Sequence, residues 1–123
     1  MKLRLRGNSI RLRLEQHEID ELIDKGEVSE KLPFSDHQSF GYTLAANKNG
    51  EFKAVFSGAI IKIEVPLGLA KSWSESDEEG IYQTLNANTA FEIKLAVEKD
   101  FQCLHKRPEE DETDLFPNPR AND

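Results

Sequence analysis

Five basic side chains open the chain in a pattern that could recognise an anion. They lie within KLRLRGNSIRLRL and are Lys2, Arg4, Arg6, Arg11 and Arg13. Each has a leucine or an isoleucine beside it, and this alternation is typical of a strand with one buried and one solvated face. The planar guanidinium of arginine matches the geometry of phosphate and carboxylate groups. We therefore expect these residues to bind a phosphate-containing ligand or an acidic protein segment.

A Gly-Asn pair at positions 7–8 separates the two basic runs and predicts a tight two-residue turn. With that turn, Arg4 faces Arg11 and Lys2 faces Arg13, and the leucines share the opposite face. Like charges directly across a strand pair destabilise it by roughly a few tenths of a kcal/mol. The hairpin therefore needs a compensating negative charge.

Three kinds of partner could supply that charge. The first is an acidic side chain on a neighbouring strand, and Glu64, Glu92 and Glu98 lie on polar faces. The second is an external anion such as a phosphate, a nucleotide or an RNA backbone. The third is the acidic end of the chain itself. The sequence leaves all three open.

The end of the chain, residues 107–123, is predicted to be an acidic, proline-containing tail that follows a single β-rich domain over residues 1–106. Acids precede an apolar pair in this tail, as in a short docking segment. The predicted docking residues are Glu110, Asp111, Asp114 and Phe116. The tail could lie on the basic hairpin of its own chain or of a neighbour, or it could be a solubilising tail without a partner.

Other chemistry has weaker signals. Cys103 and His105 could be half of a metal site, but zinc needs three or four ligands and nothing brings another one near. Phosphate-loop, dinucleotide-binding and zinc-protease motifs are missing from the sequence. We predict no catalytic residue, no metal site and no cofactor. With a single cysteine the chain also cannot form an internal disulfide.

Length and charge bound the remaining possibilities. A chain of 123 residues is one domain, and its net charge of -7 argues against general nucleic-acid binding. No uninterrupted apolar stretch reaches the length of a signal peptide core or a membrane span. We expect a cytoplasmic protein without a membrane partner.

The patterning predicts an α+β, mainly β fold. A helix is predicted at 15–26, where apolar residues recur at helical spacing, and a short helical turn at 66–73. Beyond the opening hairpin, strands are predicted at 28–34, 39–47, 51–65, 81–88 and 90–101. These elements indicate one antiparallel sheet of six or seven strands, either open and twisted or closed into a small barrel, with two short helices. No internal repeat is visible.

Three segments together resemble a family of short uncharacterised bacterial proteins. They are the opening hairpin with its RGNS turn, the stretch IEVPLGLAKSW, and the ending FQCLHKRPEEDETDLFPNP, which is of the EDExDxFPNP type. The resemblance implies a bacterial origin, a single small domain, and an ending that belongs to that domain. The family supplies no activity and therefore no catalytic residues.

The main hypothesis is a small binding or interaction module that uses the basic face of the opening hairpin. The alternative is a metal-dependent phosphohydrolase similar to triphosphate-tunnel enzymes, which line an antiparallel barrel with alternating basic and acidic residues. That family's glutamate-rich strand motif is reduced here to Glu92-Ile93-Lys94. The tunnel hypothesis requires the arginines to point into a closed barrel.

Overall fold

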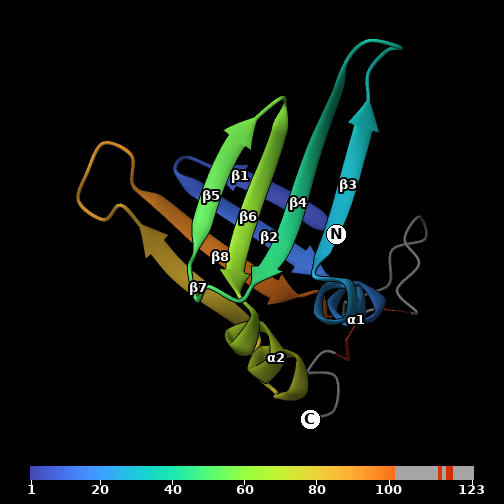
Figure 1. Ribbon diagram of the computed structural model, residues 1–123, viewed down its shortest axis with the longest axis vertical. Helices are drawn as coiled ribbons and strands as arrows, with labels where there is room; N and C mark the ends of the chain where they lie inside the picture. The colour runs from blue at the N-terminus through green and yellow to red at the C-terminus, as the bar shows by residue number, and fades with distance from the viewer. Residues whose placement is uncertain (102–113, 115, 118–123) are drawn as a thin grey trace.

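The computed structural model describes residues 1–101, 114, 116 and 117, and Figure 1 shows their arrangement. The described elements are β1 (Lys2–Arg6), β2 (Ser9–Leu14), α1 (Gln16–Lys25), β3 (Glu27–Pro33), β4 (Ser39–Asn47), β5 (Lys53–Ser57), β6 (Ile60–Pro66), α2 (Leu67–Glu75), β7 (Gly80–Leu85) and β8 (Ile93–Lys99). The fold is mainly β with two helices, as predicted. The domain boundary predicted at residues 106 and 107 lies outside the described residues and stays a prediction.

The strands form two sheets, and the prediction of one antiparallel sheet is wrong. Sheet A has the order β1-β2-β8-β7, and sheet B has the order β3-β4-β6-β5. Each sheet is mixed, because its two antiparallel hairpins are joined by a central parallel pair, β2 with β8 or β4 with β6. In the described part of the chain both sheets keep free edge strands, so the barrel alternative is wrong as well. Figure 1 shows sheet B lying across sheet A.

The chain contains two halves with the same topology, which the sequence pattern did not reveal. Each half runs hairpin, helix, hairpin: β1-β2-α1-β3-β4 and then β5-β6-α2-β7-β8. The pairing registers also correspond, since Leu3 pairs with Leu12 in the first hairpin and Ala54 pairs with Ile63 at the equivalent place. Exchanging the two halves converts the strand order of sheet A into that of sheet B.

The opening hairpin has the predicted register, with Arg4 opposite Arg11. The equivalent hairpin β5–β6 was predicted as one long strand over 51–65, and that prediction is wrong. Gly58 and Ala59 both have positive φ, at 59° and 60°, and form the tight turn between β5 and β6. Two consecutive residues with positive φ are typical of a type I′ hairpin turn, and alanine at the second position hides the signal.

Helix α1 confirms the prediction for 15–26. Glu15 and Glu18 form a capping box at its start, and Gly26 ends it with φ at 89°. Its apolar side, with Ile19 and Leu22, is buried in the core. Both helices lie together at one end of the sheets, as Figure 1 shows.

The core lies between the inner faces of the two sheets and against the helices. Its largest fully buried side chains are Trp73, Leu12, Leu14, Leu22, Leu44, Ile63, Val65 and Val97. The start of β1 is fixed in the same region, because the amino group of Met1 contacts the carboxylates of Glu18 and Glu30, and Tyr42 donates a hydrogen bond to the Met1 carbonyl at 2.8 Å. Neither described helix combines the length and the apolar character needed to cross a membrane.

Candidate anion-binding face

The outer face of sheet A collects basic residues from three of its four strands. Because Leu12 and Val97 point into the core, the alternate residues Arg11 and Ala96 face outward. The registers place the outward residues in rows across the four strands. These rows are Lys2, Arg13, Glu98 and Gly80; Arg4, Arg11, Ala96 and Tyr82; and Arg6, Ser9, Lys94 and Thr84.

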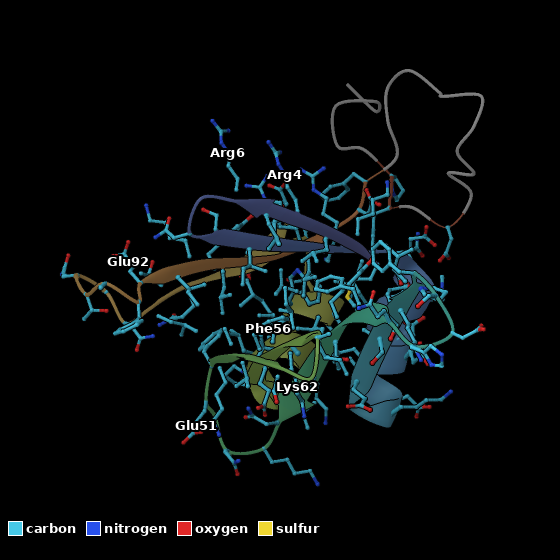
Figure 2. The ribbon with its side chains drawn as sticks, turned by 90° about the horizontal axis from the view of Figure 1, so that it is seen from above. Arg4, Arg6, Glu51, Phe56, Lys62 and Glu92 are labelled. Carbon is cyan, nitrogen blue, oxygen red and sulfur yellow. The ribbon has the colours of Figure 1, made fainter. Side chains whose placement is uncertain are left out.

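A cleft of about 670 Å³ lies on this face. Arg4, Arg6, Arg11, Lys94 and Tyr82 belong to its walls, and the small side chains between them leave it open. Figure 2 shows Arg4 and Arg6 extending outward from sheet A, on the side away from sheet B. The cleft is therefore bounded by cations and one aromatic ring.

Glu98 is the acid that compensates the arginine repulsion on this face. Its Oε1 lies 3.1 Å from Arg11 Nε and 3.6 Å from Arg13 Nε. The same oxygen is buried and makes no hydrogen bond, so these contacts are charge pairs without good hydrogen-bond alignment. The predicted compensation by an acidic side chain on a neighbouring strand is therefore correct for Arg11 and Arg13. Glu64, in contrast, lies on sheet B, where it accepts a hydrogen bond from Asn47 at 3.3 Å.

Tyr82 is held in place by the other oxygen of Glu98. The phenol donates a hydrogen bond to Glu98 Oε2 at 2.7 Å, while the residue stays 55% exposed. Burial and the neighbouring Glu98 carboxylate raise the pKa of Tyr82, so the phenol stays protonated near neutral pH. Gly80 makes the arrangement possible, because a Cβ there would lie 2.9 Å from Glu98 Cγ and 2.7 Å from the Val97 carbonyl oxygen.

Three cations of the face have no acidic partner among residues 1–101, 114, 116 and 117. These are Arg4, Arg6 and Lys94. Lys2, the remaining predicted residue, lies 3.1 Å from Asp100 Oδ2 at the end of the same face. The five predicted basic residues thus divide into three with described carboxylate partners and two that line the cleft without one.

Two of the four predicted docking residues are described, and both contact the body of the protein. Phe116 donates its backbone N–H to the Asp100 carbonyl at 2.8 Å, and its ring packs against Phe101 at 6.1 Å between centroids. Asp114 accepts a hydrogen bond from the His17 ring at the start of α1. These contacts involve α1 and the residues after β8 rather than the cationic hairpin. Glu110, Asp111, Cys103 and His105 lie outside the described residues.

One group of side chains has the composition of a metal site. Potential ligand atoms of Glu15, His17 and Asp114 lie within 4.8 Å of one another. The group is at the N-terminus of α1, however, where the helix dipole disfavours a cation. Hydrogen bonding between the His17 ring and Asp114 engages two of the three potential ligands and raises the pKa of His17, which opposes the neutral imidazole that metal binding requires. We therefore assign this group to the Asp114 contact.

The tunnel geometry required by the phosphohydrolase alternative is missing from the described part of the chain. The arginines line an open cleft on an outer face, and the leucines of the same hairpin enter the core. Glu92 of the proposed motif fragment instead accepts a hydrogen bond from Asn8 at 3.1 Å.

Sequence reasoning did not include Lys94 and Tyr82 in the site. Both lie on the second hairpin, and only the parallel pairing of β2 with β8 brings them beside the arginines. Their outward direction could be read from strand alternation, because Lys94 precedes the buried Leu95 and Tyr82 follows the buried Ile81. The neighbouring strand could not be read from the sequence.

Comparisons with known proteins give a family but no activity. No curated protein and no solved structure matches the chain. A family model, described as a family of unknown function, DUF7009, matches residues 1–120. The resemblance to an uncharacterised family is thereby confirmed, while the bacterial origin and the family motifs stay predictions. The chain belongs to the DUF7009 family, a family of unknown function.

Proposed function

We propose that this protein is a small binding module whose outer face of sheet A takes phosphate-bearing anions. The observation that carries the proposal is the cleft that Arg4, Arg6 and Lys94 line without a described carboxylate partner. Positive charges gathered on one sheet face repel one another, and this repulsion destabilises the sheet. A bound anion would relieve it. An arginine pair beside a lysine offers both forked and point-charge donors to phosphate oxygens.

Glu98 supports the proposal because its carboxylate contacts Arg11, Arg13 and Tyr82, and no contact with Arg4 or Arg6 is found among the described residues. It lies beside Arg11 and Arg13 and is bonded to Tyr82, so its charge is engaged at one side of the face. Arg4 and Arg6 belong to β1 at the edge of sheet A and extend outward from it (Figure 2). The local charge of the cleft is therefore positive although the chain as a whole is acidic.

The test is calorimetric titration with inorganic polyphosphate. The double substitution Arg4→Gln with Arg6→Gln removes two charges from residues that have no described ion pair, so it should spare the fold. We expect polyphosphate affinity to fall roughly ten-fold or more, because a hydrogen bond to a charged group contributes about 1.5–3 kcal/mol. Lys31→Gln with Lys62→Gln is the matched control on the outer face of sheet B and should bind as the wild type does. Equal affinity of all three proteins would refute the proposal.

Glu110 and Asp111 stay predicted competitors for the same cations. If they bind the basic face, Glu110→Gln with Asp111→Asn should tighten polyphosphate binding, since fewer carboxylates compete with the ligand. An unchanged polyphosphate affinity would show that these two residues do not compete for the basic face, and it would not affect the phosphate proposal.

A further inference from the structure

The shape of the cleft favours a ligand that is a chain rather than a compact molecule. Its walls include outward residues from all four strands of sheet A, and the helices lie at the end of the sheets rather than over this face (Figure 1). Sites for compact ligands are usually concave and mostly apolar, and they enclose most of the ligand surface. This cleft instead lies open along a sheet.

The unpartnered cations are spaced for a repeating anion. Arg4 and Arg6 are two residues apart on β1, so their Cα atoms are separated by roughly 6.6 Å along the strand. Lys94 lies in the same row as Arg6, with Ser9 of β2 between them. Successive phosphates of one extended strand could therefore contact the two arginines in turn, and the strand could continue across β2 towards Lys94.

Tyr82 adds a surface for an unpaired base. It shares a row with Arg4 and Arg11, and the small Ala96 between Tyr82 and Arg11 leaves space beside the ring. The hydrogen bond to Glu98 fixes the ring, so little conformational freedom is lost when a base stacks on it. Proteins that bind single strands combine a cationic groove with aromatic rings on which bases stack.

We propose that the outer face of sheet A binds single-stranded nucleic acid, with phosphates on Arg4, Arg6 and Lys94 and one base stacked on Tyr82. This inference rests on the proposed function and specifies its ligand. A duplex does not fit the same arrangement, because its bases are paired and stacked on one another and cannot reach the ring. The negative charge of the whole chain does not oppose the inference, since Glu98 is the one acid in the three described rows of this face.

The experiment compares a fluorescein-labelled oligouridylate of about ten nucleotides, a length within the usual range for a single binding domain, with inorganic polyphosphate. Anisotropy is measured with the full chain and with two variants. Tyr82→Leu removes the ring and keeps an apolar side chain, and Tyr82→Phe keeps the ring and removes the hydroxyl. We expect Tyr82→Leu to weaken oligouridylate binding roughly 5- to 150-fold, the range of one base stack. We expect Tyr82→Phe to retain most of the affinity, and polyphosphate binding to be the same in all three proteins.

The outcomes separate the inference from the proposed function. If Tyr82→Leu changes neither the oligouridylate affinity nor the polyphosphate affinity, the base contact is refuted and the anion-binding proposal is unaffected. Duplex RNA bound as tightly as the single strand would also overturn the base contact. A protein that binds none of these ligands would overturn both proposals.

A spectroscopic readout on the wild-type protein keeps the test independent of variant folding. Stacking of a base should move the Tyr82 ring proton resonances upfield when oligouridylate is added, and polyphosphate should not. Identical ring shifts with the two ligands would contradict the inference.

Discussion

The two sheets have the same topology and register but different outer faces. In the equivalent hairpins β1–β2 and β5–β6, the inner positions are apolar in both, as for Leu12 and its counterpart Ile63. The outer positions differ, because Val55 stands at the place of Arg4 and Ser57 at the place of Arg6. Comparing the two halves of this chain therefore separates the residues that the shared topology requires from those that it does not.

The difference shows which residues the fold needs. A hairpin, a helix and a second hairpin assemble twice with buried aliphatic side chains in matching rows, so these rows determine the architecture. The outward arginines occur in one half only, and they add repulsion that the other half lacks. The shared architecture therefore does not require Arg4 and Arg6, and this agrees with the proposed binding role of these two residues.

The largest expected effect tests the equivalence of the buried rows. Leu12→Ala and Ile63→Ala each remove a side chain that is 1% exposed and leave a cavity between the sheets. Each should lower the free energy of unfolding by about 2–5 kcal/mol. Chemical denaturation checks this, and a loss confined to one of the two variants would break the comparison between the halves.

The next effect concerns Glu98, whose counterpart in sheet B is Ala45. Glu98→Gln removes the charge that faces Arg11 and Arg13 and should cost roughly 1–3 kcal/mol, because these cations lose a nearly buried anion. It should also lower the pKa of Tyr82 towards the ordinary phenol value, since burial then acts without the carboxylate. Denaturation and alkaline absorbance titration measure the two effects. A Tyr82 titration identical to that of the wild type would contradict the assigned contact.

A smaller effect tests the predicted docking of the tail. Phe116→Ala removes a half-buried ring that contacts Phe101 and lies 5.4 Å from the ammonium of Lys99. We expect a loss of about 1 kcal/mol, less than for a fully buried aromatic side chain. A thermal melt provides the measurement, and an unchanged melting temperature would refute the docking of Phe116.

The smallest effect is the pH dependence of the contact between Asp114 and His17. Hydrogen bonding between them raises the pKa of His17 and lowers the pKa of Asp114. The histidine contribution is complete below its ordinary value of 6.5 and is lost as pH rises through the raised value. The aspartate contribution is present above its ordinary value of 3.8 and is lost as pH falls through the lowered value.

The contact should therefore stabilise the protein most between about pH 4 and 6.5. Both groups are exposed, so the gain over His17→Ala should be only a few tenths of a kcal/mol. Melting curves of the two proteins across this range measure it. A difference that grows above pH 8 would have the wrong sign.

Local structure was predictable where local chemistry determines it. The hairpin turn at Gly7-Asn8, the register of Arg4 with Arg11, and helix α1 with its cap at Gly26 all follow from neighbouring residues. The turn at Gly58-Ala59 was missed because alanine rarely occupies a position with positive φ. Propensity therefore predicted the type of most elements but joined two strands into one.

The pairing of strands was not predictable in the same way. Nothing near Leu12 specifies that it will lie beside Val97 in a parallel pair, because that contact forms only when both halves assemble. For this reason the single antiparallel sheet was wrong, and Lys94 and Tyr82 were absent from the predicted site. The arginines themselves were predictable, since their direction depends only on alternation along a strand.

The most direct test gives β1 the outer residues of β5, its equivalent in the other half of the chain. Arg4→Val with Arg6→Ser gives β1 the side chains that β5 carries at Val55 and Ser57. We predict that the free energy of unfolding stays equal to that of the wild type or rises, because valine suits a strand and a like-charge pair is lost. Polyphosphate affinity should fall at least ten-fold in the same protein. A variant that unfolds more easily by about 1 kcal/mol or more, or that binds polyphosphate as the wild type does, would contradict the proposal that Arg4 and Arg6 serve binding and not folding.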